Sequence, residues 1–308
     1  MESTLFTILI DIFWRTSKIY LGVIFGYLMI LSPLKKYREL FVKITINVFT
    51  PILIFISILQ VERSNEAIFP IFASLLVTFG GIALVKLLSF GRETPKPSEV
   101  CTAAFPNALN FPFPLIFALS PDSLGAAGIF LVVQIILRNT VGLWISGVKV
   151  SKSNISEILR FPPIWSVLIG LIGRISLQSS IRITLSTQNF WIDLIVEIGI
   201  FATLMTLGFG IQKPSIDHIN SYLRVGSTRF ILTPLILLAL LFPFEVPSVI
   251  LVAMIIQTMA PPAVYNGIYA ERFHLDTNLT SNTTLVLTML ALLIIPLEFY
   301  LLDYYLIT

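Results

Sequence analysis

Apolar runs of about twenty residues follow one another along almost the whole of this 308-residue chain. A helix needs about 20 apolar residues to cross the hydrocarbon core of a bilayer, and the chain is 56% hydrophobic and only 12% charged. We therefore expect an all-helical integral membrane protein. The runs predict ten spans, over residues 17–33, 41–60, 67–90, 99–119, 124–147, 161–178, 189–211, 222–243, 247–270 and 280–302.

The fourth and ninth of these runs are interrupted in the middle. The fourth contains Pro106, Pro112 and Pro114, and the ninth contains Pro261 and Pro262. In lipid, an unpaired backbone N–H or C=O costs several kcal/mol, so a spanning helix breaks only where protein or a watery cavity pairs these groups. One broken span in each half of a chain indicates the substrate site of a secondary transporter.

The position of the breaks also predicts how the chain is divided. Five spans in each half, an odd number, give the halves opposite topology, which is an inverted repeat with both breaks at a common depth. We expect an N-terminal segment 1–16, which either lies in the interface or extends the first span. The first repeat then covers 17–147, a short cytoplasmic linker 148–160, and the second repeat 161–308.

Lysine and arginine set the expected orientation, because they are enriched in inner loops. With both termini on the non-cytoplasmic side, twelve fall inside and five outside. The inner residues are Lys35, Lys36, Arg38, Lys43, Arg92, Lys96, Lys149, Lys152, Arg160, Lys213, Arg224 and Arg272, and the outer ones are Arg15, Lys18, Arg63, Arg174 and Arg182. The sequons at Asn154, Asn278 and Asn282 then lie inside, so no glycan is expected.

Asparagines accompany the prolines in both broken spans. Asn107 and Asn110 lie in the first break, and Asn266 lies just beyond the second. Their amides offer donors and an acceptor without net charge, and the half-helix after a break presents free N–H groups and a partial positive end. Such a pocket suits a carboxylate. The alternative is a pair of proline kinks that only shape helix packing; the asparagines favour a site.

Several charged residues lie within the predicted spans. Arg138 in the fifth span either draws anions toward the site or makes a structural contact, and both interpretations stay open. Asp193 and Glu197 share one face of the seventh span near its outer end, where we favour a structural or interfacial role over a proton relay. Lys86 and Arg229 are expected at the membrane interface.

The composition argues against several other classes of protein. Two histidines and one cysteine are too few for a metal cage or a disulfide framework, and no cofactor is expected; Cys101 is predicted to be a small buried apolar residue. The sequence contains no Walker motif and no catalytic constellation, so we expect neither an ATP-driven pump nor an enzyme. Basic residues in short loops set orientation and do not indicate a nucleic-acid partner.

The two breaks also carry a family resemblance. The stretch Asn107-Ala-Leu-Asn110-Phe-Pro112 resembles the Asn-Thr-Gly-Asn-Leu-Pro motif in the fourth span of auxin efflux carriers. The stretch from Ala260 to Phe273 is similar to the ninth span of their prokaryotic relatives, and looser matches cover nearly the whole chain in order. Leu109 stands where the auxin carriers have glycine, and the long cytoplasmic loop of the plant proteins is absent. These departures favour a compact, prokaryotic-type or loop-less member.

The resemblance implies a fold related to bile-acid symporters and sodium/proton antiporters. Spans 1, 2, 6 and 7 would form a scaffold and a homodimer interface, and spans 3–5 with 8–10 a transport domain that moves as an elevator. The fourth and ninth spans would cross at their prolines, with Asn110 on the substrate carboxylate. The candidate substrate-binding residues are Asn107, Asn110, Pro112, Arg138, Pro261, Pro262, Tyr265 and Asn266.

The sequence thus predicts a secondary carrier of a small organic anion, auxin-like or a dicarboxylate such as malate or malonate. We expect it in the plasma membrane or the endoplasmic reticulum. An apolar lining from Phe105, Phe111, Phe113 and Tyr265 would suit a hydrophobic anion. The main alternative is a sodium- or proton-coupled symporter or antiporter of the same fold with another solute. A membrane enzyme and a channel-like or structural membrane protein are the alternatives from other classes.

Overall fold

The computed structural model describes residues 2–60, 67–91, 93–148, 156, 160, 162–176, 190–211 and 217–302. In these ranges every regular element is a helix, as the apolar runs predicted. Most of the expected linker 148–160 lies outside the described residues. So do the following basic residues and sequon: Arg63, Arg92, Lys149, Lys152, Asn154, Arg182 and Lys213.

Among the described residues, six helical stretches are long and apolar enough to cross a membrane, where the sequence predicted ten spans. They are Pro33–Leu59, Ile68–Leu88, Pro121–Ile145, Phe190–Gly208, Ile219–Leu241 and Thr277–Ile294. Three further apolar stretches are shorter, Ser17–Leu31, Pro162–Ser176 and Ser248–Met259. The two breaks explain part of the difference between the ten expected spans and the six long helices. A proline pair ends one helix at Met259, and the expected span 99–119 consists of two eight-residue helices.

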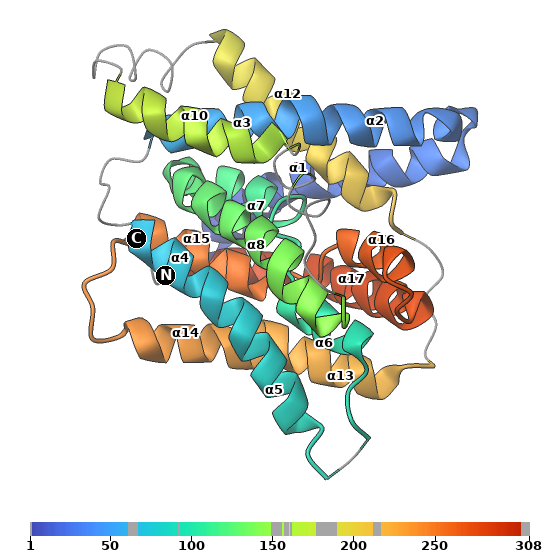
Figure 1. Ribbon diagram of the computed structural model, residues 1–308. Helices are drawn as coiled ribbons and strands as arrows, with labels where there is room; N and C mark the ends of the chain where they lie inside the picture. The colour runs from blue at the N-terminus through green and yellow to red at the C-terminus, as the bar shows by residue number, and fades with distance from the viewer. Residues whose placement is uncertain are drawn as a thin grey trace.

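One group of helices forms a layer at the top of Figure 1. It contains α1 (Glu2–Leu31), α2 (Arg38–Ile44), α3 (Thr50–Gln60), α10 (Pro162–Ser176) and α12 (Phe190–Gly208). Helix α1 packs along α12, and α10 packs along α3.

Two glycines allow the close packing of α1 on α12. A Cβ atom on Gly26 would lie 2.1 Å from the Met205 carbonyl oxygen, and one on Gly208 would lie 2.1 Å from the Val23 carbonyl oxygen. Backbone cannot move aside as a side chain can, so any larger residue would push the two helices apart. Close approach through small residues is the usual way in which membrane helices pack.

The second group lies below this layer in Figure 1 and contains two bent helices. Helices α4 (Ile68–Leu75) and α5 (Gly81–Leu88) join through a π-helical turn, Leu76–Gly80. Helices α13 (Ile219–Ser227) and α14 (Thr233–Leu241) join through another, Thr228–Leu232. Each turn packs against the other bent helix, so the two cross at their π-helical turns.

The remaining helices fill the space between the bent pair and the upper layer. These are α6 (Pro97–Ala104), α7 (Pro112–Leu119), α8 (Leu124–Ile145), α15 (Ser248–Met259), α16 (Tyr265–Arg272) and α17 (Thr277–Leu302). Their buried apolar side chains form the centre of the protein, among them Phe113, Phe130 and Ile256.

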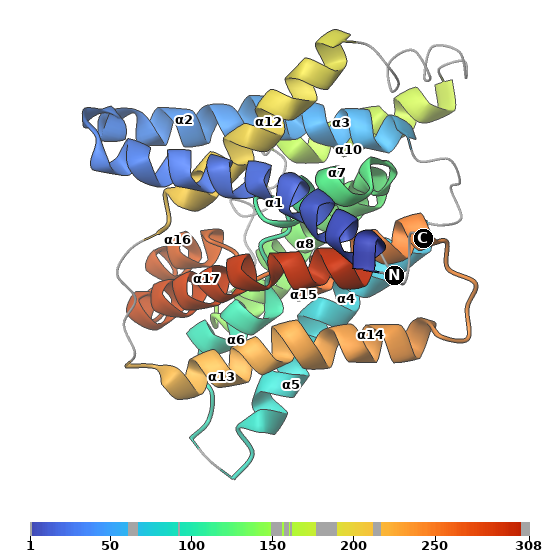
Figure 2. The same cartoon turned by 180° about the vertical axis from the view of Figure 1, so that it is seen from behind.

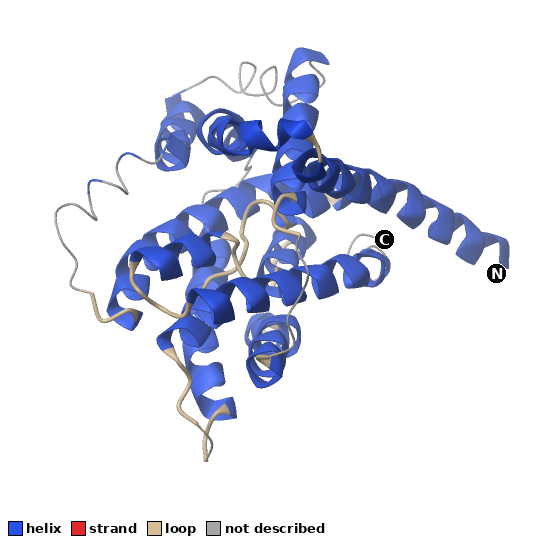
Figure 3. Ribbon diagram, turned by 90° about the vertical axis from the view of Figure 1, so that its right-hand side faces the viewer, coloured by secondary structure: helices blue, strands red, loops and turns tan. Residues whose placement is uncertain are grey.

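Helix α1 is continuous from Glu2 to Leu31, so the N-terminal segment continues the helix of the first span. Its beginning projects away from the rest of the protein in Figure 3. The beginning of α1 and the end of α17 lie at the same end of the molecule (Figure 2).

Candidate functional site

The first break separates α6 from α7. Pro106 cannot donate to the Thr102 carbonyl, and a residue before proline avoids the helical region. Phe105 is accordingly extended, with φ −115° and ψ 102°. The chain resumes a helix only at Pro112, which tolerates the first helical position because no donor is needed there.

The second break separates α15 from α16 by the same local rule. Ala260 precedes Pro261 and is extended, with φ −59° and ψ 140°. Helix α16 begins at Tyr265. Both interruptions therefore lie where the prolines predicted them.

The two breaks meet at their prolines. Pro106 and Pro262 form an isolated antiparallel bridge. The Asn107 backbone N–H donates to the Pro261 carbonyl over 2.7 Å, and the Ala263 N–H donates to the Phe105 carbonyl over 3.1 Å. Each extended segment thus pairs backbone groups that the other would leave open, as a break in a membrane helix requires.

Side chains pair further carbonyls at the crossing. Pro112 has no N–H for the Ala108 carbonyl, and Gln257 of α15 donates to this carbonyl over 3.1 Å. The Pro106 carbonyl accepts from the Nη2 atom of Arg138 over 3.4 Å. The sequence drew attention to Arg138, but nothing in it indicated the pairing of Gln257, whose partner lies in the other half of the chain.

Arg229 corrects an expectation. It was expected at the membrane interface, but it is completely buried, and its guanidinium donates to the Ala260 carbonyl over 2.8 and 3.1 Å. Arg229 also donates to the Gln257 carbonyl over 3.4 Å. This carbonyl has no helical donor, because residue 261, four positions further on, is proline. A cation at a helix C-terminus is electrostatically favourable as well. Arg229 is thus the cap of broken helix α15.

A cavity of about 120 Å³ lies beside the crossing. Both breaks and α8 line it, and four of the candidate residues contribute: Asn107, Asn110, Arg138 and Tyr265. The other four, Pro112, Pro261, Pro262 and Asn266, are not among the residues that line it. The prolines shape the breaks.

Asn266 is buried, and its amide donates to the Phe105 carbonyl over 2.9 Å, which makes it part of the crossing. Phe111 and Phe113 are packed into the apolar core, and Phe105 is fully buried. Of the four aromatic residues expected to line the site, Tyr265 alone is among those that do. The expected aromatic lining is therefore wrong for the other three.

The donors of the cavity come from side chains. Pro112 and Pro114 have no N–H, and the Phe113 N–H bonds to the Leu109 carbonyl over 3.2 Å, so the start of α7 offers fewer free donors than expected. Asn107 instead has a buried Nδ2 atom without a partner among the described residues, and the same holds for Nε of Arg138.

The charge of the cavity is positive. The Arg138 guanidinium carbon lies 5.4 Å from the centre of the Tyr265 ring and 5.7 Å from that of Phe105. Within the described part of the chain no carboxylate forms an ion pair with Arg138. An aromatic face stabilises a cation but does not neutralise it, so the guanidinium can still bind an anion.

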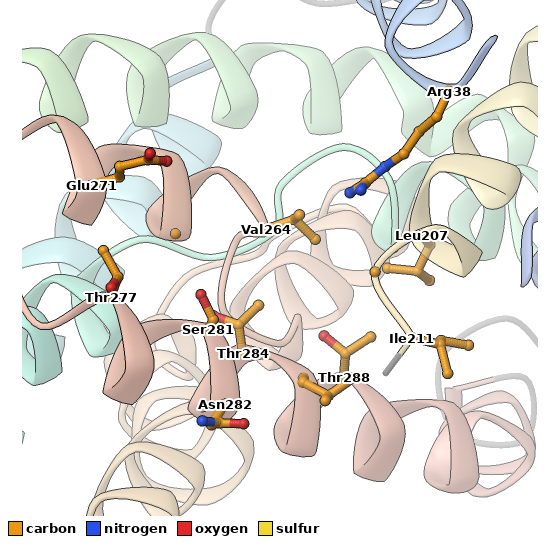
Figure 4. A pocket seen from close by; sticks show the side chains of 13 residues that line it. Arg38, Leu207, Ile211, Val264, Glu271, Thr277, Ser281, Asn282, Thr284 and Thr288 are labelled. Carbon is orange, nitrogen blue, oxygen red and sulfur yellow. The ribbon is translucent and has the colours of Figure 1, made fainter. Parts of the chain in front are cut away.

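A larger cavity of about 450 Å³ lies between the two groups of helices (Figure 4). Arg38 of α2 points into it from one side, and Ser281, Thr284 and Thr288 of α17 from the other. Val264 lines both this cavity and the smaller one at the crossing. The two cavities therefore adjoin at the second break.

Two ion pairs hold the polar end of the second group of helices. Glu99 is buried, and Arg224 donates to its two oxygens over 2.6 and 3.0 Å. Lys96 donates to Asp276 over 2.9 Å. The carboxyl of Asp276 accepts from the Leu279 N–H and from Lys96, and these bonds lower its pKa below the ordinary value of 3.8.

The remaining sequence expectations concern single residues. Cys101 is buried, as predicted. Lys86, Asp193 and Glu197 are exposed on the protein surface, which fits the interfacial role expected for them.

Comparison with known proteins bears on the second half of the chain. A family model described as membrane transport protein, the domain of the auxin efflux carriers, matches residues 146–299, half of the chain. The matched region contains the second break and Arg229. No curated protein matches the chain.

Proposed function

The chain belongs to the membrane transport protein family of the auxin efflux carriers, and we propose that this member is a secondary carrier of a small organic anion. Its family and its apolar helices make it an integral membrane transport protein. The anion and the mechanism are our proposal.

The observation that carries this proposal is the polar cavity at the crossing. An ionisable side chain within a membrane protein is costly unless it is paired, and it commonly marks a substrate path. Arg138 lacks a carboxylate partner in the described residues, and Asn107 has a free amide donor beside it. A carboxylate would accept from both. The cavity of about 120 Å³ suits a small acid, or the acidic end of a larger one.

We propose transport by alternating access, with ten spans in two inverted repeats. Each half contains one broken helix, and the two broken helices cross. The helices with π-helical turns at Leu76–Gly80 in the first half and Thr228–Leu232 in the second also cross, and the first half has a further π-helical turn at Thr45–Phe49. The beginning of α1 and the end of α17 lie at one end of the molecule (Figure 2), which suits an even number of crossings with both termini outside. The crossing helices and the position of the two ends support the proposed pair of inverted repeats.

The upper layer of helices suits the scaffold of an elevator, and the second group suits its moving part. The larger cavity lies between them, where relative movement would open and close a path. Exposed apolar side chains on α1 and α10, such as Phe25, Trp165 and Ile172, could pack against a second copy of the chain. We propose a homodimer through this layer.

The sodium-coupled alternative has less support at the crossing. Transporters of this kind coordinate sodium through carbonyls of unwound helices. Here the carbonyls of Phe105, Pro106 and Ala260 already accept hydrogen bonds, and the last two accept them from arginines. A guanidinium there would repel a sodium ion.

Binding of acids by the purified protein tests the proposal. We would measure thermal shift and surface binding with indole-3-acetate, malate, malonate and citrate for the parent and for Arg138→Gln and Asn110→Ala. Asn139→Ala is the matched control, since Asn139 is one residue from Arg138 on α8 and its amide bonds to its own helix.

We expect saturable binding of at least one acid, strongly weakened by Arg138→Gln and retained by Asn139→Ala. Uptake by proteoliposomes with sodium replaced by potassium should be unchanged. If no acid binds, or if Arg138→Gln binds as well as the parent, the proposed function is wrong.

A further inference from the structure

One side-chain acceptor that lines the cavity at the crossing is buried and has no hydrogen-bond partner among the described residues. Gln134 of α8 lines the cavity and is almost completely buried. Its Nε2 atom donates to the Ser74 carbonyl and hydroxyl, both over 3.0 Å, and to the Thr78 hydroxyl over 3.1 Å. Its Oε1 atom has no partner in the part of the chain that the structure describes.

The orientation of this amide follows from its neighbours. A carbonyl oxygen accepts only, so the atom that faces the Ser74 carbonyl has to be the nitrogen of Gln134. Turning the amide around would place two acceptors against each other. The free atom of Gln134 is therefore an oxygen.

Asn107 shows the opposite arrangement. Its Oδ1 atom accepts from the Asn110 backbone N–H over 3.0 Å. A backbone N–H donates only, so this amide is oriented as firmly, and its free buried atom is the donor Nδ2. With Nε of Arg138, the buried side-chain atoms that line the cavity and have no partner among the described residues are two donors and one acceptor.

A plain carboxylate matches only part of this set, because it accepts hydrogen bonds and donates none. It would pair with Asn107 and Arg138 and leave Gln134 Oε1 unpaired. A buried acceptor without a partner is costly. A site that is built to bond a substrate hydroxyl or N–H rejects the analogue that lacks it, for the same reason.

We propose that the transported acid carries a hydrogen-bond donor of its own, a hydroxyl or an N–H, in addition to its carboxylate. The carboxylate accepts from Arg138 and Asn107, and the donor bonds to Oε1 of Gln134. This inference rests on the proposed function and narrows its substrate class to hydroxy acids and acids with an N–H group.

Pairs of acids of which one member lacks the donor test this assignment. We would measure affinities for malate against succinate, lactate against propionate, and indole-3-acetate against its N-methyl derivative. In the parent protein we expect the donor-bearing member of at least one pair to bind roughly 10- to 100-fold more tightly.

Two variants then identify the acceptor. Gln134→Met keeps an unbranched side chain but has no amide oxygen, so the preference should fall to near onefold. Thr50→Val is the matched control, because Thr50 lines the same cavity and is a second acceptor there: its hydroxyl donates to the Thr45 carbonyl over 2.9 Å and keeps lone pairs that can accept. The preference should survive in this variant. Because each preference is a ratio within one protein, a partial loss of folded protein does not change it.

The outcomes separate the two proposals. If both members of every pair bind equally to the parent, acids are substrates but the inference about their donor is wrong, and a water molecule fills the role of partner to Gln134. A preference that persists in Gln134→Met also overturns it. If no acid of either kind binds, the proposed function fails, and this inference with it.

Discussion

The cap that Arg229 provides for broken helix α15 leads to a measurable loss of stability in Arg229→Leu. The leucine cannot donate, so the buried carbonyls of Ala260 and Gln257 lose the guanidinium that now pairs them. Because these acceptors belong to the backbone, no second substitution removes them.

A buried polar group left without a partner costs about 1–3 kcal/mol. Two such carbonyls give an expected loss of about 2–6 kcal/mol in the free energy of unfolding. Relief of the buried charge opposes this loss. Arg229→Gln separates the two effects, since its amide is neutral but can still donate to the Ala260 carbonyl. We expect it to lie between the parent and the leucine variant.

Thermal unfolding in detergent would measure the effect, with a decrease of at least about 4 °C expected for Arg229→Leu. Arg38→Leu is the control, because Arg38 is exposed at the start of α2 and should change the unfolding temperature little. If Arg229→Leu unfolds at the temperature of the parent, the two carbonyls do not depend on Arg229, and the argument about the cap is refuted.

Three further predictions concern the packing and the polar end of the second group of helices. Gly81→Ala should destabilise the protein by about 1–3 kcal/mol, because the new Cβ atom would lie 2.7 Å from a backbone oxygen of α6. The neighbouring Gly80→Ala should be tolerated, because its Cβ atom would meet nothing closer than 3.5 Å. Chemical unfolding of the two variants checks this prediction. Arg224→Met leaves the buried carboxylate of Glu99 unpaired and should lower the free energy of unfolding by about 3–5 kcal/mol. The double variant with Glu99→Gln should recover much of this loss in the same assay. Equal stability of the parent, the single variant and the double variant would contradict a structural ion pair. The pKa of the Asp276 carboxyl is lower in the folded protein than its ordinary value of 3.8. Its contribution to stability is therefore present above that value and lost as the pH falls below it. As the pH is lowered, the unfolding temperature of Asp276→Asn should fall less steeply than that of the parent.

The backbone rules at proline are local, and they made the breaks predictable from sequence. Pro106 and Pro261 disfavour the helical conformation at the residues before them, and Phe105 and Ala260 are extended accordingly. The requirement for pairing in lipid indicated that the two segments would find partners. The helical class and the membrane environment followed from apolar runs in the same way. Arg138 stood out as well, because a cation in an apolar run is unusual at any position.

The partners of the backbone carbonyls that lose their helical donors at the prolines could not be predicted, because these partners come from residues that are distant in sequence. Arg229 has the same local surroundings as an arginine that reaches the membrane interface, and only the packing of its π-helical turn against α15 brings it to the Ala260 carbonyl. Asn266 bears the same amide as Asn107, yet the fold brings one to the Phe105 carbonyl and leaves a donor of the other beside the cavity.

Local sequence therefore indicates where a helix can stop and which atoms lose their partners, because proline acts on its own turn of chain. Which side chain supplies the missing bond, and which polar atom stays available to a substrate, depends on contacts between helices far apart in the chain. For Gln134 the difference is a single oxygen, which becomes available because the fold presents Ser74 and Thr78 to the other end of its amide.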